Sequence, residues 1–595
     1  MRTQLNISLI RIGLFSLVCG ICCSQLAGQT QEKEIVSKPA EVCARPAEGS
    51  AIREPAAWRS KDGTLRVELT FHSERGPNGF TRYCYTDENG QESPTLRVRP
   101  GDMLVLKFKN KAVVDTGDAE TKGKSAHSTA EHSNDKKSED DPCAGGPMSA
   151  GSTNIHFHGM VVPPTCHQDE TIKTLIRPGS AEFEYKIRIP KTEPPGLYWY
   201  HPHPHGLSEE QVLGGASGAL IVEGVEKFNR EAGGLPERVF VIRDQEMPNA
   251  SAPSLADPNK PTKDLSINYV AVPYPRFPPA VLKTPPGKKE YWRVVNASAD
   301  TFLDLSLRYG GKVQTIGLVE MDGVPIGYDE QNTNDNVIKT RVLLPPAGRA
   351  EFIVTTPAAG VEGMLETLAV PRGPLNDPDL RPGPGGKAGA PGQADQDDND
   401  PLRPLAVIRS SANTPESADV LPKSPDVMES SEAVSLASTR PIRTRKFYFS
   451  EQLVDPKNPK GATLFFITEE GHTPKVFDPN DPPDVIVHQG DVEDWIIENR
   501  SNEPHTFHIH QTHFLVIQRY GGPYEDVTLR DTINIPFWSG LSRFYPSVRL
   551  RMDFRDPGIV GTFPYHCHIL QHEDGGMMGT IRVEPAISSK PAETH

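Results

Sequence analysis

The sequence YHCHILQHEDGGM, at residues 565–577, brings one thiol, three imidazoles and a thioether into a single short stretch. In a β-strand, successive side chains point to opposite faces of the sheet. If this stretch is a strand, Cys567 points to one face, and His566 and His568 point to the other. A metal ion bound through Cys567 would then lie across the strand from metal ions bound by the two histidines. The stretch therefore predicts two metal sites, one on each face.

The first of these sites can be completed from nearby residues. His572 and Met577 follow where a turn can return them to Cys567. A cysteine, histidines and a weak methionine ligand are typical of blue-copper electron-transfer sites, which need a second histidine. His505 lies three residues before His508 and can turn to the opposite side of its strand. We therefore predict that His505 completes this site.

Eleven of the 19 histidines fall in four clusters, and each cluster contains a His-x-His pair. The pairs are His156 and His158, His201 and His203, His508 and His510, and His566 and His568. On a strand, both members of such a pair share one face. Two pairs lie near each end of the chain, so they converge if the first and last domains abut. Eight imidazoles suit three metal ions, whereas structural zinc needs neither four pairs nor a methionine.

An internal repeat indicates how the chain is divided. TLRVRPGDMLVLKFKN (95–110), AVLKTPPGKKEYWRVVNAS (280–298) and DVIVHQGDVEDWIIENRS (484–501) each read as strand, Pro/Gly turn, strand and Asn. Three copies predict an all-β chain of three β-sandwich domains. We expect a first domain at 55–225, a middle domain at 236–372, a Pro/Gly/Asp-rich linker at 373–440 and a last domain at 441–588. The middle copy lacks histidine and is expected to be a spacer; residues 113–152 are expected to form an exposed insertion.

Bulk properties exclude several classes of protein. A length of 595 residues is too great for one core. The formal charge of −15 argues against binding to nucleic acid or to anionic membranes. The apolar run at 12–23 follows basic residues and precedes small ones, so residues 1–28 are expected to be a signal peptide for export to the periplasm or outside the cell. A lipoprotein is the alternative, although bulky Val18 precedes Cys19. We expect no transmembrane segment and a monomer.

Five cysteines remain beyond the expected signal peptide. Cys43, Cys84, Cys143 and Cys166 can form two disulfides in an oxidising compartment, with three possible pairings. The odd cysteine is Cys567, and this parity favours a ligand role for its thiol.

These motifs together resemble those of the multicopper oxidases, and the chain is most similar to the three-domain bacterial laccase-like members. The resemblance covers roughly residues 60–225, 236–360 and 440–585. It implies three consecutive cupredoxin-like Greek-key β-sandwich or barrel domains and four copper ions: one type 1, one type 2 and two type 3. It implies type 1 ligands His505, Cys567, His572 and Met577; type 2 ligands His156 and His508; and type 3 ligands His158, His201, His203, His510, His566 and His568.

The resemblance also implies a reaction. A small reducing substrate, which is a phenol, an aromatic amine or a metal ion, gives up single electrons at type 1 copper, and the other three coppers reduce dioxygen to water. We expect His505 and His572 to form the exposed edge where electrons enter. Glu573 matches a family position that relays protons, and Asp169 is a second candidate.

Two other functions remain open at this stage. A metallo-oxidase for cuprous or ferrous ions fits the same ligands, although neither insertion is rich in methionine as in cuprous specialists. A structural cupredoxin-like protein that has lost copper fits less well, because the ligand set is complete. The resemblance makes Met577 an axial ligand, which implies a lower potential than in members with Leu or Phe at that position and favours easily oxidised phenols and aromatic amines.

Overall fold

The computed structural model describes residues 41–76, 79–113, 141–247, 257, 259–328, 336–373, 399–415, 417, 419–423, 435–458, 461–520 and 528–586. The expected signal peptide, most of the 113–152 insertion and much of the expected linker lie outside these residues. Those from Val42 onward belong to one compact unit.

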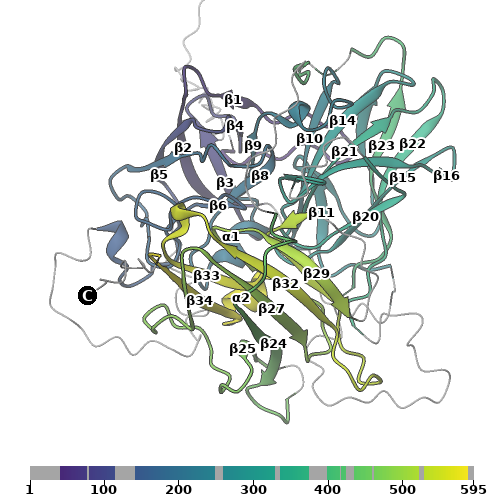
Figure 1. The fold of residues 1–595 in the computed structure, drawn as a ribbon. Coiled ribbons are helices and arrows are strands. Elements are labelled where there is room, and N and C mark those ends of the chain that lie inside the picture. Colours follow the sequence, from purple (N-terminus) through teal and green to yellow (C-terminus); the bar gives the residue numbers. More distant parts are fainter. Residues whose placement is uncertain are drawn as a thin grey trace, which may run out of the picture. The chain divides into compact units, whose positions relative to one another are not determined.

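The described strands form six sheets, which pair into three sandwiches (Figure 1). Alternating sequences produce them: in β7 (Phe183–Arg188), apolar residues are buried and charged residues exposed in strict turn. The first sandwich contains a sheet ordered β1 (Ala57–Arg59), β4 (Thr95–Val98), β9 (Gly218–Val222), β8 (Gly196–His201), β6 (His156–His158), and a sheet ordered β3 (Thr81–Asp87), β2 (Thr64–Arg75), β5 (Met103–Asn110), β7.

The middle sandwich has the same plan with extra edge strands. One sheet is ordered β12 (Val270–Val272), β11 (Asp264–Ile267), β10 (Glu237–Gln245), β14 (Lys289–Asn296), β21 (Arg349–Thr355), β17 (Ile316–Met321), β18 (Val324–Pro325), with β19 (Val337–Lys339) on β17. The other is ordered β13 (Ala280–Thr284), β23 (Arg403–Ser410), β22 (Glu362–Leu368), β15 (Leu303–Tyr309), β16 (Lys312–Val313), with β20 (Arg341–Leu344) on β15.

The third sandwich contains residues 565–577, the cysteine- and histidine-rich stretch. One sheet is ordered β25 (Thr463–Glu469), β24 (Arg443–Leu453), β27 (Asp491–Asn499), β32 (Ser547–Phe554), β29 (Phe514–Tyr520), β30 (Leu529–Arg530). The other is ordered β26 (Val485–His488), β34 (Met578–Glu584), β33 (Gly561–Cys567), β28 (His505–Ile509), β31 (Thr532–Ile535). Each sandwich has its own large apolar core.

Corresponding strands occupy corresponding places in all three sandwiches. The order β3-β2-β5-β7 recurs as β11-β10-β14-β21 and as β25-β24-β27-β32. The second strand of each repeated segment (β5, β14 or β27) pairs in parallel with β2, β10 or β24, while its other neighbour is antiparallel. The sequence repeat therefore reflects one topology used three times, and the prediction of an all-β fold is confirmed.

The expectation that residues 373–440 are a linker is wrong for residues 403–410. They form β23, which pairs with β13 in parallel and with β22 in antiparallel fashion. β23 holds the place that β9 and β34 hold in the other sandwiches, so the middle sandwich is incomplete without it. The short apolar run LAVI is hidden between stretches rich in Pro, Gly and Asp, which explains the error.

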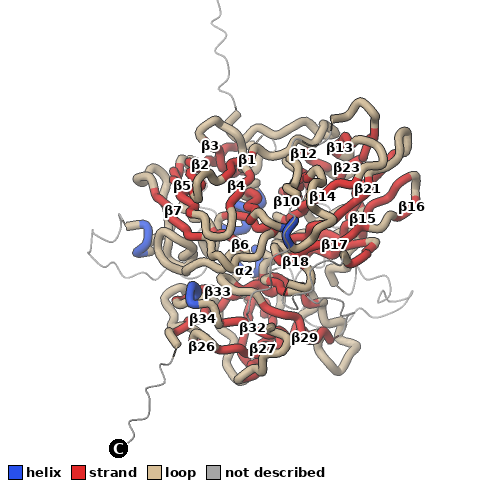
Figure 2. Tube along the Cα trace, turned by 45° about the horizontal axis from the view of Figure 1, so that its top comes forward, coloured by secondary structure: helices blue, strands red, loops and turns tan. Residues whose placement is uncertain are grey.

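Two short helices lie where the first and third sandwiches meet, α1 (Ser208–Leu213) and α2 (Leu570–Asp574). The carboxylate of Asp574 in α2 accepts hydrogen bonds from the backbone N–H groups of Gly206 and Glu209, at 2.7 and 2.9 Å. Figure 2 shows that helical segments, drawn in blue, are minor elements among the strands. Short 3-10 turns occur at Pro142–Ala144, Val225–Lys227 and Pro557–Ile559. Neither helix in the described part of the chain has the length or the apolar run of a membrane span.

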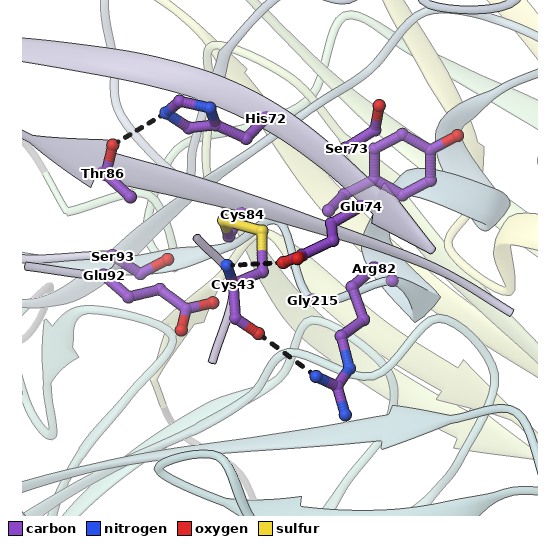
Figure 3. The surroundings of a disulfide bond; sticks show 12 residues. Cys43, His72, Ser73, Glu74, Arg82, Cys84, Thr86, Glu92, Ser93 and Gly215 are labelled. Atoms are coloured by element: carbon purple, nitrogen blue, oxygen red, sulfur yellow. Dashed lines mark hydrogen bonds between the residues drawn. A yellow bond between two sulfur atoms is a disulfide. The ribbon is translucent and has the colours of Figure 1, made fainter. Parts of the chain in front are cut away.

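Two disulfides stabilise the first sandwich, and they join Cys43 to Cys84 and Cys143 to Cys166. The first ties the segment before β1 to β3. Around it, the N–H of Cys43 donates to Glu74 at 3.1 Å and the guanidinium of Arg82 donates to the Cys43 carbonyl at 3.5 Å (Figure 3). The sequence left three pairings open, because cysteine spacing alone does not fix partners.

Replacing Cys43 and Cys84 together by serine should lower the free energy of unfolding of the first sandwich by about 4 kcal/mol, because the bond restricts a loop of 41 residues in the unfolded chain. Denaturant unfolding followed by fluorescence measures the change. The Cys143/Cys166 double serine variant, whose loop spans 23 residues, should lose less. A Cys43/Cys84 variant as stable as the parent would contradict the expectation.

Candidate metal centre

Strand register places the histidine pairs beside one another. In the first sandwich, His156 on β6 lies opposite His201 on β8. In the third, His508 on β28 lies opposite His566 on β33. Directly opposed residues on antiparallel strands have their side chains in contact. Each sandwich therefore presents a compact patch of imidazoles from two adjacent strands.

The two patches meet, and their eight imidazoles form one buried cluster. The ring nitrogens fall into groups whose members lie within 4.8 Å of one another: His156, His158 and His508; His158, His201 and His568; and His203, His510 and His566. Within the last group, the Nε2 atom of His566 lies 3.2 Å from Nε2 of His203 and 3.2 Å from Nε2 of His510. Each group combines residues from both ends of the chain.

Several ring nitrogens of the cluster lack hydrogen-bond partners, in contrast to the Nε2 atoms of His203 and His510, which both contact Nε2 of His566. These unpartnered buried atoms include His156 Nε2, His158 Nδ1, His201 Nε2, His508 Nε2 and both ring nitrogens of His568. Burial, followed by the neighbouring imidazoles, holds the pKa of His156 and of His568 well below the usual range. Buried polar atoms normally have partners, and neutral imidazole is a metal ligand. The cluster therefore fits several metal ions.

Carboxylates contact the outer nitrogens of the cluster. Nδ1 of His156 lies 3.0 Å from Oδ2 of Asp169, and Oδ1 of the same carboxylate accepts the N–H of Phe157 at 2.9 Å. Nδ1 of His566 lies 3.1 Å from Glu573, while its hydrogen bond goes to the carbonyl of Cys567 at 3.0 Å. A metal-ligating histidine commonly donates its other ring N–H to a carboxylate or a carbonyl, and this contact fixes its orientation. Both residues expected to move protons thus lie against the cluster.

Asp531 is a third carboxylate at the cluster, and sequence reasoning missed it. Its Oδ1 lies 3.1 Å from Nε2 of His158, and its carbonyl accepts a hydrogen bond from Nδ1 of His508 at 2.9 Å. Burial raises its pKa, but the Arg349 guanidinium and His158 outweigh this effect and hold the pKa well below the usual range. No motif surrounds Asp531, which lies between two short strands of mixed polarity, β30 and β31.

The second site lies on the opposite face of β33. Nδ1 of His505 is 3.1 Å from Nδ1 of His572, and the Cys567 sulfur is 3.6 and 3.7 Å from these two atoms. The centre of this triangle is about 2 Å from each corner, close to the bond lengths of about 2.0–2.3 Å that a metal makes with nitrogen and sulfur. Met577 is fully buried in the same apolar core as Cys567, and its carbonyl accepts the Cys567 N–H at 3.1 Å.

The expectation that His505 and His572 form an exposed edge is wrong. They are 0 % and 1 % exposed. The ring of Phe449 lies over His505 and that of Phe465 stacks on His572. Nε2 of His505 is 3.2 Å from Glu451, and Nε2 of His572 is 3.3 Å from Glu503. The four residues that cover these histidines are either distant in sequence or outside any motif. The sequence therefore could not reveal that the two histidines are buried.

Three β-sandwiches of one topology, with a Cys/His triangle on one face of a strand and eight imidazoles on the other, define a copper-dependent oxidoreductase built from cupredoxin domains. Family models described as multicopper oxidase match residues 148–227 and 454–586. These two matches, together with the relatives below, support a place for the chain among the bacterial laccase-like multicopper oxidases.

Individual relatives have low sequence identity to this chain, but the matches cover most of both sequences. A multicopper oxidase of Staphylococcus aureus is 25% identical over 441 residues, which cover 73% of this chain and 77% of the relative. A laccase of Haloferax volcanii is 24% identical, with coverage of 94% and 88%. A solved multicopper oxidase of Campylobacter jejuni, described as a metallo-oxidase, superposes with a TM-score of 0.61 at 24% identity and covers 91% of this chain and 96% of its own.

Proposed function

We propose that this chain oxidises small phenolic or aromatic-amine donors one electron at a time at the Cys567 site and reduces dioxygen to water at the histidine cluster. The pairing of the two sites on one strand supports this reaction. The sulfur of Cys567 belongs to one site, while its covalent neighbours His566 and His568 belong to the other. Electrons collected on one face thus have a short bonded route to the opposite face.

We assign four copper ions to these residues. The type 1 ligands are His505, Cys567, His572 and Met577; the type 2 ligands are His156 and His508; the type 3 ligands are His158, His201, His203, His510, His566 and His568. The unpartnered ring nitrogens and the size of the Cys567 triangle support the assignment. When bound, copper supplies one-electron redox chemistry and the reduction of dioxygen.

The chain itself orients the ligands and excludes water. The backbone N–H of Thr506 donates to the Cys567 sulfur at 3.4 Å, which fixes the position of the thiolate. All eight cluster histidines are at most 2 % exposed. A dry, rigid site keeps the ligand positions nearly constant between oxidation states, and this constancy favours rapid electron transfer.

We propose that Glu573 and Asp169 deliver the protons that dioxygen reduction consumes. The two oxygens of Glu573 lie 3.1 Å from Nδ1 of His566 and 3.6 Å from Nε2 of His203, so the carboxylate spans two ligands. Burial raises the pKa of Asp169 well above its usual range. Proton transfer by a positioned carboxyl group requires such close placement.

A pocket beside His505 determines which electron donor is preferred. Its volume is about 430 Å³, and Pro504, Asn534 and Pro536 in its wall flank His505 and the residue paired with it, Ile535. None of the described residues that line the pocket carries a charge: Phe302, Leu343, Val370, Pro371, Pro504, Tyr520, Asn534, Pro536, Phe537, Trp538, Ser539, Ser542, Phe544 and Pro546. An aromatic wall with few polar groups suits a neutral aromatic molecule better than a hydrated cation.

Oxidation of cuprous or ferrous ions is the second candidate. Glu503 lies 3.3 Å from His572 and Glu451 lies 3.2 Å from His505, so carboxylates able to attract a cation contact both histidines. The relative from Campylobacter jejuni is described as a metallo-oxidase. Oxygen uptake with a phenol, an aromatic diamine, Cu(I) and Fe(II), compared as kcat/KM, separates the two functions. A preference for either metal ion would overturn the first proposal.

Replacing Trp538 by alanine should raise KM for a phenol by about 10-fold or more, because an aromatic wall of this size contributes roughly 1.5–3 kcal/mol when a ligand buries it. Oxygen uptake measures the effect, and kcat/KM for Fe(II) should not change. Leu541→Ala is the matched control, since Leu541 lies in the same loop, is 79% exposed and does not line the pocket. Equal losses for phenol and Fe(II) would contradict the role of the pocket.

We further propose that the chain is exported and acts as a monomer in the periplasm or outside the cell. The two disulfides support an oxidising compartment. Mass spectrometry of the mature protein tests whether residues 1–28 are removed.

A further inference from the structure

Arg349, at the start of β21 in the middle sandwich, lies where all three sandwiches meet. Its side chain is fully buried. A guanidinium has five N–H donors, and here each of them has an acceptor. The acceptors are the carbonyls of Leu197, Ala347 and Asp322, at 3.2, 3.2 and 2.8 Å, and the two carboxylate oxygens of Asp531.

Two of these contacts leave the middle sandwich. The Leu197 carbonyl belongs to β8, the strand that ends in His201. The contact with Asp531 is bidentate: Nη1 donates to Oδ1 at 2.7 Å, and Nη2 donates to Oδ2. A bidentate Arg–carboxylate pair fixes orientation as well as charge. The domain expected to be a spacer therefore supplies a rigid contact to both halves of the cluster.

Asp531 transmits this contact to two histidines. Its Oδ1 accepts from Nε2 of His158 at 3.1 Å, and its carbonyl accepts from Nδ1 of His508 at 2.9 Å. The hydroxyl of Thr532 donates to the same Oδ1 at 2.7 Å. With these nitrogens engaged, Nδ1 of His158 and Nε2 of His508 are the atoms left without partners. The hydrogen bonds thus decide which nitrogen of each ring faces the cluster.

Gly159 provides an independent observation that the ion pair shapes the motif. A Cβ atom at this position would lie 2.4 Å from Nη2 of Arg349 and 2.6 Å from Oδ2 of Asp531, and φ of Gly159 is +87°. Any larger residue would force the guanidinium and the carboxylate away. A glycine is therefore required after the first His-x-His pair, because the Arg349 side chain from another sandwich occupies the space that a Cβ atom would fill.

We infer that Arg349 is a positioning residue for the cluster: by holding Asp531, it orients His158 and His508 so that their free nitrogens face the copper ions. This inference rests on the proposed function, because it assumes that the cluster binds copper. Partners of this kind typically contribute 10–100-fold to metal affinity.

The test compares Arg349→Lys and Arg349→Met with the parent, all loaded with copper. Lysine keeps the charge but loses the bidentate geometry. We expect both variants to keep the blue absorption of the Cys567 site and to lose type 2 copper to a competing chelator about 10–100-fold more readily, with an altered type 2 EPR spectrum. Arg293→Lys is the matched control, since Arg293 is equally buried in the same sandwich and pairs instead with Glu237 and Glu351.

A double variant, Arg349→Met with Asp531→Leu, separates positioning from simple support of the fold. Replacing a buried ion pair by apolar residues usually restores stability. If the pair only supports the fold, the double variant should recover both thermal stability and type 2 copper, and this result would overturn the inference. If Arg349 positions the cluster, the double variant should recover its stability but still lose type 2 copper. This comparison remains possible even if the single Arg349→Met variant does not fold.

The same measurements distinguish a failure of the proposed function from a failure of the role inferred for Arg349. A parent protein that shows no type 2 signal after copper loading would refute the proposed function itself. A parent with the signal, together with Arg349→Lys and double variants that match it in spectrum and chelator resistance, would refute only the role of Arg349.

Discussion

The Cys567→Ser variant should be colourless and should consume oxygen more than about 100-fold more slowly than the parent, a loss beyond that expected for an outer hydrogen-bond partner. The strong colour of a blue-copper site comes from the bond between copper and a thiolate, and a serine hydroxyl cannot replace it. Absorption spectroscopy and oxygen uptake with a phenol measure the two effects.

The Cys567→Ser variant should retain the copper ions of the histidine cluster. The cluster histidines lie on the other side of the strand, so the type 2 EPR signal should persist and the copper content should fall by about one ion per chain, since one metal occupies such a site. Cys567 is the only free cysteine in the described part of the chain, so no other thiol there can replace it. A blue serine variant would refute the assignment of the type 1 site.

The His508→Ala variant should stay blue while its oxygen consumption falls by more than about 100-fold, again beyond the loss of an outer partner. His505 and His508 share β28 but stand at odd spacing, so their side chains point to opposite faces. Removing His508 therefore leaves the Cys567 triangle intact and takes one ligand from the cluster.

Stopped-flow mixing with a phenol under nitrogen should show that the blue centre is still reduced, and admission of oxygen should show that it is not reoxidised. His72→Ala is the control, since His72 contacts Thr86 in the first sandwich and belongs to none of the histidine groups. Oxygen uptake at the parental rate in His508→Ala would contradict the assignment of the cluster.

The sequence predicted those features that depend on local periodicity. Alternation of apolar residues identified the strands, and the repeated strand–turn–strand segment predicted three sandwiches of one kind. The convergence of the His-x-His pairs followed because residues two apart share a face of a strand. The two faces of β33 follow from the same rule, since His566 and Cys567 are adjacent.

Features that depend on packing between distant segments could not be predicted. Arg349 and Asp531 are 182 residues apart, and neither lies in a motif. Glu503 and Phe465, which cover His572, come from segments 69 and 107 residues before it, so its burial was missed. β23 was lost because a strand of eight residues sits among stretches whose composition is typical of linkers.

The way in which the histidine groups draw on both ends of the chain has a consequence for assembly. His203 and His566, whose ring nitrogens lie 3.2 Å apart, are separated by 363 residues. An ion bound between histidines of the two ends would therefore act as a reversible cross-link between the first and third sandwiches. Such a cross-link closes a very long loop, and a ligand that binds only the folded state stabilises it by mass action. Under the proposed assignment, bound copper would therefore stabilise this interface, and its removal would weaken the docking of sandwiches that are each folded around their own cores.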